Sequence, residues 1–169
     1  MARMSLYEAS VPVFIRALSS LAAVLEKGEA HASARKIDPA VLLGARLFPD
    51  MFPLSKQVQI ASDAAKGGAA RLAQQQPPSF EDNEQSFAEL IERCRKTVKY
   101  LESLKPAQFE GGEDRTVSWQ SRSATKTMQG LPYLQHHVLP NVFFHVTTAY
   151  NILRHNGVEL GKQDFLGRP

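Results

Sequence analysis

The residues that could do chemistry gather in the segment PNVFFHVTTAYNILRHNGVELG, from Pro140 to Gly161. Apolar residues recur there at three- and four-residue spacing, which predicts an amphipathic helix with His145 on its inward side. Three interpretations of His145 stay open: a hydrogen-bonded core residue, a pocket residue that binds or polarises a small ligand, and a metal ligand or catalytic base. We expect the first, with Gln57, Tyr150 or a backbone carbonyl as its partner.

Other candidate site residues are those that could surround His145 in the folded protein. A catalytic base needs a group that orients it, and Asp50 and Asp63 are the carboxylates near the second predicted helix. The segment FPDMFP, residues 48–53, forms either a lid over one end of the fold or a rigid turn. Trp119 either caps the same opening or anchors a hairpin to the core.

Several kinds of chemistry are excluded by the sequence. The chain has one cysteine, Cys94, so it forms neither an intramolecular disulfide nor a cluster of thiolate ligands. Cys94 shares its helical register with Phe87, Leu90 and Ile91, which predicts a buried thiol rather than a nucleophile. The sequence contains no glycine-rich phosphate loop, no dinucleotide fingerprint and no Gly-x-Ser-x-Gly elbow, which argues against nucleotide-driven chemistry.

The composition indicates one globular domain, residues 1–169, with 43% hydrophobic and 22% charged residues. Lys and Arg number 20 against 17 Asp and Glu, a net charge of +3, although the sequence pI is about 9.1. The basic residues at 93–99 alternate with glutamates, so we expect a solvated helix face and no nucleic-acid partner. No secretory signal and no apolar run of bilayer length is apparent, so we expect a cytoplasmic protein without a membrane partner.

The spacing of apolar residues predicts an all-α protein, a four-helix bundle with a short β-hairpin insert before the last helix. The hairpin is predicted from Thr116–Gln120 and Thr125–Gln129, with its turn near Ser121–Ser123. The four predicted helices cover approximately residues 5–27, 52–74, 84–104 and 140–156.

Glycine and proline positions refine these boundaries. Pro12 predicts a kink or a late start of the first helix, and Gly28 is expected to end it. Gly67 and Gly68 either let a neighbouring helix approach closely or break the second helix. Gly157 is expected to end the last helix in a left-handed conformation.

Three segments carry a resemblance to a known family: PDMFPLSKQVQIASD, SFAELIERCRKTVKYLESL and LPNVFFHVTTAYNILRHNGVELGKQDFLG. They resemble one uncharacterised bacterial family of the DinB-like superfamily. The resemblance implies a four-helix bundle of up-down-down-up topology, commonly a homodimer. Many superfamily members hold a divalent metal on three histidines, and some are thiol-dependent transferases or related metalloenzymes.

The superfamily motif in the last helix is His-x3-His, followed by an Arg-x-x-Gly helix end. Aligning that end on Arg154 and Gly157 puts the second histidine at His145 and the first at Asn141. The third ligand comes from the second helix, where this chain offers Gln57 or Gln59.

Amide oxygens are much weaker ligands than imidazole for zinc or nickel. His136 and His137 precede Pro140, so we expect them off the helical face of His145. We therefore expect no cofactor and a metal-free, small-ligand-binding or stress-associated homodimer. The alternative is a hydrolase or thiol transferase that uses zinc or nickel at His145.

Overall fold

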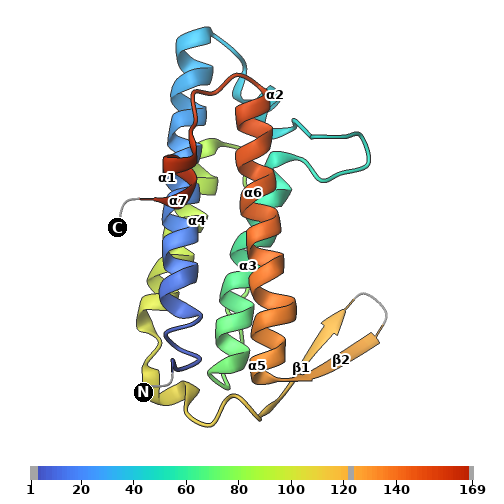
Figure 1. The fold of residues 1–169 in the computed structure, drawn as a ribbon. Coiled ribbons are helices and arrows are strands. Elements are labelled where there is room, and N and C mark those ends of the chain that lie inside the picture. Colours follow the sequence, from blue (N-terminus) through green and yellow to red (C-terminus); the bar gives the residue numbers. More distant parts are fainter. Residues whose placement is uncertain (1–3, 122–123, 168–169) are drawn as a thin grey trace.

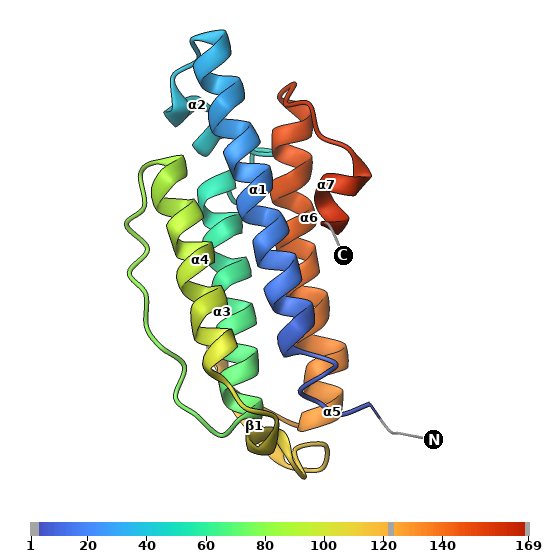
Figure 2. The same cartoon turned by 90° about the vertical axis from the view of Figure 1, so that its left-hand side faces the viewer.

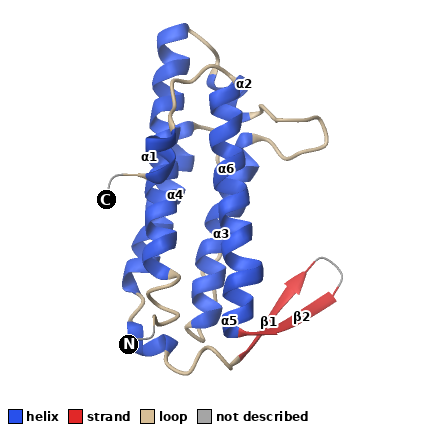
Figure 3. Cartoon of the chain, viewed as in Figure 1, coloured by secondary structure: helices blue, strands red, loops and turns tan. Residues whose placement is uncertain are grey.

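The computed structural model describes residues 4–121 and 124–167 and consists mainly of helices packed side by side (Figure 1, Figure 3). A small two-stranded sheet projects from one end of the helical body (Figure 3). Buried side chains from all the long helices form one hydrophobic core. The long helices are α1 (Val11–Arg35), α3 (Leu54–Leu72), α4 (Phe87–Ser103) and α6 (Leu139–His155).

The helix directions follow from the connections between them. The linker over residues 73–86 runs back along the length of the molecule, so α3 and α4 begin at the same end (Figure 2). Hydrogen bonds from α3 to both of its neighbours agree with this arrangement: Ser62 pairs with Thr97 of α4, and Gln57 pairs with His145 of α6. The linker therefore has to be held against the helices over a long distance.

The first helix starts late, as Pro12 predicts, because proline fits the first turn of a helix where its missing N–H is not needed. The prediction that Gly28 ends this helix is wrong, since α1 continues to Arg35. Gly28 is instead a contact point: a Cβ there would lie 3.0 Å from the Phe87 ring and 3.1 Å from Leu153. Glycine at this position lets α4 and α6 pack close to α1.

The second long helix is continuous through Gly67 and Gly68, so the predicted alternative of a break is wrong. Gly68 faces Val138, where a Cβ would overlap the valine side chain, so glycine permits close approach of the helices. The next helix, α4, begins after Ser86 and not at Glu84. The Ser86 hydroxyl accepts from the backbone N–H of Glu89, which satisfies one free donor of the first turn.

The hairpin predicted before the last helix is present as β1 (Thr116–Ser121) and β2 (Ala124–Gln129), paired antiparallel. Its predicted turn lies partly outside the described residues, which omit 122 and 123. Val117 and Trp119 are buried while their neighbours in β1 are exposed, so one side of β1 faces the helices. The short 3-10 helix η1 (Pro106–Phe109) lies between α4 and the hairpin.

The last helix is longer than its predicted range, because α5 (Gly130–Tyr133) and the π-helix η2 (Leu134–Val138) lead directly into α6. In the wider π turn, the Leu139 N–H donates to the Leu134 carbonyl five residues back. Such a turn accommodates Pro140, whose ring would clash with the carbonyl four residues earlier in a regular α-helix. The backbone is therefore helical on both sides of Pro140.

The segment after α6 packs against the helical body. Gly157 has a φ of 92°, the left-handed conformation that was predicted for the end of α6. The terminal α7 (Lys162–Leu166) lies across α1 (Figure 1). Phe165 packs edge-on against Tyr150 with ring centroids 5.9 Å apart, whereas Leu166 is largely exposed.

The short α2 (Pro39–Leu43) follows α1 and is capped by the Asp38 carboxylate, which accepts from the Ala40 N–H. The connection after Gly44 then projects away from the helices before α3 (Figure 1). In the described ranges, no helix combines the length and apolar character that crossing a membrane requires.

Candidate functional site

His145 is buried on α6, with 8% of its surface exposed, and its partner is Gln57 of α3. His145 Nδ1 lies 2.6 Å from Gln57 Oε1. The predicted hydrogen-bonded histidine with Gln57 as a partner is therefore confirmed. The Phe144 ring packs edge-on against the imidazole, with ring centroids 5.1 Å apart.

The surroundings of Gln57 determine which nitrogen of His145 carries the proton. Gln57 Nε2 donates to the Phe52 carbonyl over 3.0 Å, which turns its oxygen toward the imidazole. His145 Nδ1 must then be the donor, and Nε2 keeps a lone pair in the neutral ring. Burial lowers the pKa of His145, so the neutral ring is favoured.

These residues do not form a suitable donor set for a metal ion. Gln57 occupies Nδ1 of His145 through its oxygen and the Phe52 carbonyl through its nitrogen, so neither of its polar atoms is free. Asn141 offers only an amide, which is a weak ligand for zinc or nickel. In residues 4–121 and 124–167, no three His, Cys, Asp or Glu side chains are placed to hold a metal ion.

A cavity of about 200 Å³ lies between α3 and the helix from Tyr133 to Asn141, with neither His145 nor Gln57 in its lining, and we call it the α3–α6 groove. Its polar residues come from both walls. They are Asp63 and Arg71 on α3, with Tyr133, His137 and Asn141 opposite; Ile60, Ala64 and Val138 supply the apolar lining.

His137 was expected off the helical face of His145, and the lining of the groove contains His137 but not His145. The π turn keeps the chain helical up to Pro140, so that His137 and Asn141 line one groove. Trp119 and Tyr133 fix the imidazole, with ring centroids 4.6 and 5.5 Å from it. Trp119 thus anchors the hairpin beside His137, at the opposite end of α3 from the loop that contains Asp50.

Arg71 reaches the groove because Gly67 leaves room for it. A Cβ at position 67 would lie 2.7 Å from Nη1 of Arg71, so the guanidinium lies across the glycine one turn earlier in α3. Nη1 donates to the Tyr133 hydroxyl at 3.5 Å. Burial raises the pKa of Tyr133, which keeps the phenol protonated.

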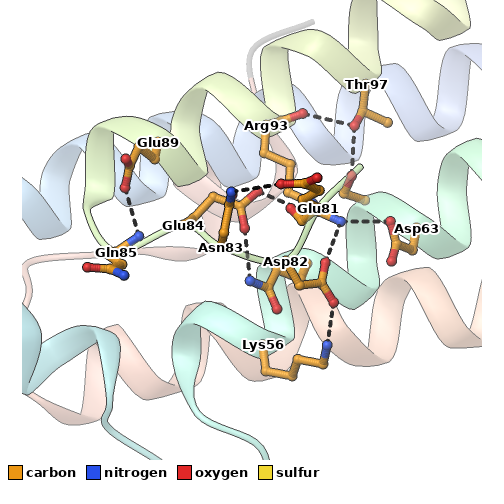
Figure 4. A network of polar contacts seen from close by, with 12 residues as sticks. Lys56, Asp63, Glu81, Asp82, Asn83, Glu84, Gln85, Glu89, Arg93 and Thr97 are labelled. Carbon is orange, nitrogen blue, oxygen red and sulfur yellow. Dashed lines mark hydrogen bonds and ion pairs between the residues drawn. The ribbon is translucent and has the colours of Figure 1, made fainter. Parts of the chain in front are cut away.

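A second polar cluster surrounds Arg93 and ties the linker to the helices (Figure 4). Arg93 was predicted on a solvated face, yet it is 3% exposed. Its guanidinium donates to Glu84 Oε1 at 2.7 Å, to Asp63 Oδ1 at 2.8 Å and to the Glu81 carbonyl at 3.0 Å. Asp82 Oδ1 lies 3.0 Å away. The guanidinium of Arg93 therefore binds acceptors of the linker (Glu81, Asp82 and Glu84) and of α3 (Asp63) at once. This set of residues, the Arg93 cluster, holds the linker in place.

The other predicted site residues lie elsewhere. Gln59 donates to Glu84 over 2.9 Å, so it belongs to the Arg93 cluster and not to the His145 site. Asp50 is exposed on the projecting loop, and Tyr150 packs on Phe165. Asp63 does not orient His145, because its carboxylate binds Lys66 and Arg93.

Cys94 is completely buried, as predicted. Burial raises the pKa of its thiol to about 12, so it stays protonated near neutral pH. It offers no nucleophile in the folded protein.

Arg71, Tyr133 and His137 line the groove although the sequence did not predict them as site residues. Two signals for them were present, the four-residue spacings from Gly67 to Arg71 and from His137 to Asn141, which place side chains on one face of a helix.

The family model described as "Domain of unknown function (DUF1993)" matches residues 6–166. The chain belongs to this family. A solved structure described as a DinB family member protein from Shewanella denitrificans is 43% identical, with a TM-score of 0.91. The match covers 97% of this chain and 93% of the other. No curated protein gives a significant match. The predicted resemblance to an uncharacterised DinB-like family is therefore confirmed.

Proposed function

We propose that this DUF1993 protein binds a small molecule in the α3–α6 groove and does so without a metal ion. The observation that carries the proposal is the Gln57–His145 hydrogen bond, which engages the amide oxygen of Gln57 and leaves Nε2 of His145 as the single strong ligand atom of this pair, where a metal site usually needs three protein ligands. The α3–α6 groove is lined by polar side chains from α3 and from the helix opposite it. Pockets with a few convergent polar groups are the usual form of a small-molecule site.

The metal-free part of the proposal is tested by elemental analysis of protein purified without a histidine tag or chelator. We expect far less than one zinc, nickel or manganese ion per chain, even after incubation with each metal. The comparison variants are His145→Ala and His155→Ala, the second of which changes an exposed histidine on the same helix. About one metal ion per chain, lost only in His145→Ala, would refute the proposal and favour the metal-dependent hydrolase or thiol transferase.

The ligand-binding part is tested by native mass spectrometry of the gently purified protein and of Asn141→Ala. Asn141 is half-buried in the groove, and its side chain makes no hydrogen bond to any described residue. The variant should therefore keep the fold and lose the bound molecule. Equal occupancy in both proteins would place the ligand elsewhere.

We also propose that the four long helices have the up-down-down-up topology of the superfamily. We further propose that two chains form a homodimer through the outer face of α6. Residues 139–153 contain no Asp, Glu, Lys or Arg. On this uncharged helix, Phe143 and Phe144 are 36% and 56% exposed, and exposed apolar patches of this kind mark association surfaces. Light scattering at micromolar concentration should give twice the chain mass, and Phe144→Asp should halve it. A wild-type monomer would refute the dimer.

A further inference from the structure

We propose that the Arg71 end of the α3–α6 groove is a binding site for a small oxyanion, either a carboxylate or a phosphate group. This inference rests on the proposed ligand-binding function and names the chemical class of the ligand. It stands on the guanidinium of Arg71 and on the groups that face it across the groove.

Arg71 carries a positive charge that the fold does not balance. No carboxylate in residues 4–121 and 124–167 lies within ion-pair distance of it, although the chain pairs Arg93 and Arg95 with acids. Its one hydrogen-bond partner among the described residues is the neutral Tyr133 hydroxyl. A half-buried guanidinium with donors to spare matches the planar, two-oxygen geometry of carboxylate and phosphate.

The positive charge of Arg71 also affects His137. Burial lowers the pKa of His137, and the charges of Lys126 and Arg71 lower it further. The charged or titratable groups around the imidazole are Arg71 and Asp63 on α3, Lys126 on β2 and Tyr133 on α5. An anion bound between Arg71 and His137 would offset the charges of Arg71 and Lys126. It would thereby favour the protonated form of the His137 imidazole, which can then donate a hydrogen bond to the anion.

The one acid in the groove does not replace such an anion. Asp63 is engaged by Lys66 and by the buried Arg93, so its charge is already balanced. It lies eight residues before Arg71, about 12 Å along the helix at 1.5 Å per residue. The two ends of the groove therefore differ in charge, and the Arg71 end favours an anion.

The dimensions of the groove set the size of the ligand. A cavity of about 200 Å³ accommodates an oxyanion head and a few further atoms, but not a nucleotide. Asn141 and the Tyr133 hydroxyl add hydrogen-bonding groups, and Ile60 and Ala64 give an apolar wall for a short carbon chain. A small organic acid or a small phosphate ester fits this lining.

The test is NMR titration of the His137 ring with sodium phosphate and, separately, sodium acetate, with sodium chloride at equal ionic strength as the reference. We expect saturable shifts of the His137 signals with at least one of the two oxyanions, and a raised His137 pKa in the bound state. Saturation by phosphate alone identifies a phosphate site, and saturation by acetate alone identifies a carboxylate site.

Arg71→Gln should weaken binding at least tenfold. The matched control is Arg95→Gln, which removes the same charge from an exposed arginine on α4 and should bind like the wild type. Asn141→Ala is a second variant in the groove that disturbs no hydrogen bond of the described residues. Equal losses in Arg71→Gln and Arg95→Gln, or shifts that grow linearly as with chloride, would overturn the oxyanion site.

The outcomes separate this inference from the proposed function. A neutral or cationic molecule found by native mass spectrometry and lost in Asn141→Ala, with no effect of phosphate or acetate, would leave the ligand-binding proposal standing and overturn the oxyanion site. Absence of any bound molecule together with absence of oxyanion binding would overturn both.

Discussion

Arg93 is predicted to be the most important single polar side chain for stability. We consider Arg93→Met, which keeps an unbranched apolar stem but removes the guanidinium donors that bind Glu84, Asp63 and Asp82. Burial opposes the charge of Arg93, but the Glu84 and Asp63 carboxylates outweigh it and raise the pKa of the guanidinium. The variant leaves these carboxylates without their shared cation.

The magnitude follows from the exposure of each partner. The Asp63 and Asp82 side chains are 43% and 36% exposed, so solvent screens them and each pair contributes at most about 1 kcal/mol. Glu84 is only 10% exposed, and a hydrogen bond to a charged group in such a place contributes about 1.5–3 kcal/mol. We therefore expect a loss of about 3 kcal/mol, at the low end for breaking a buried ion pair.

The assay is equilibrium denaturation in urea, with thermal unfolding alongside. For a chain of this size, a loss of about 3 kcal/mol lowers the Tm by roughly 6–12 °C. Arg95→Met is the matched control on the same helix, because Arg95 is 62% exposed and pairs with the exposed Glu26, so its loss should change stability by less than about 0.5 kcal/mol. Equal effects of the two substitutions would refute the reasoning.

A double-mutant cycle separates the Glu84 bond from the rest. Glu84→Gln combined with Arg93→Met should cost less than the two single changes added together, by about 1 kcal/mol or more, because the residues are in direct contact. Additive effects would show that the Arg93 side chain acts through packing alone.

Further predictions concern three titratable groups and one close backbone contact. Cys94 should react with an aromatic disulfide reagent only after unfolding, because burial raises the pKa of its thiol to about 12; rapid reaction of the native protein would contradict this. His145 should titrate below 6.5 by NMR, since burial lowers its pKa, and its contribution to stability should be complete above pH 6.5 and decrease as the pH falls through the folded value. Burial raises the pKa of Asp82, but Lys56 and Arg93 outweigh it and lower the net value, so the stability that Asp82 contributes should be lost as the pH falls below about 4 in acid titrations of the folded protein. Gly130→Ala should destabilise the chain by about 1–3 kcal/mol in urea, because the new Cβ would overlap the Gly112 carbonyl oxygen.

Periodicity in the sequence was enough to predict the long helices and the hairpin. Apolar residues repeat at helical spacing through α1, α3, α4 and α6, and that pattern reflects burial against a common core. The alternation in β1 likewise predicted a strand with Val117 and Trp119 on its covered side. The partnership of Gln57 with His145 was also among the predicted alternatives, because a buried imidazole requires a hydrogen-bond partner.

The predictions that differ from the structure concern residue types that can have two different structural roles. Gly28 was expected to end a helix, but it is buried where α4 and α6 contact α1, and a local signal cannot distinguish a stop from a close contact. Pro140 was expected to interrupt the regular helix, but a π turn accommodates the proline and leaves His137 in one groove with Asn141. Arg93 was assigned to a solvated face because its neighbours in the sequence are charged, whereas its partners come from the linker and from α3.

The sequence by itself determined the four long helices and the hairpin, the buried thiol of Cys94, the inward direction of His145 and the family resemblance. The first three depend on spacing along one helix or strand, which the sequence displays directly, and the resemblance depends on the order of residues alone. Only the tertiary structure decided that Gln57, and not Gln59, meets His145, and that Arg71 faces His137 across a groove. Such pairings depend on how α3 is rotated and shifted against its neighbours, and that is set by the packing of the whole core rather than by any local pattern.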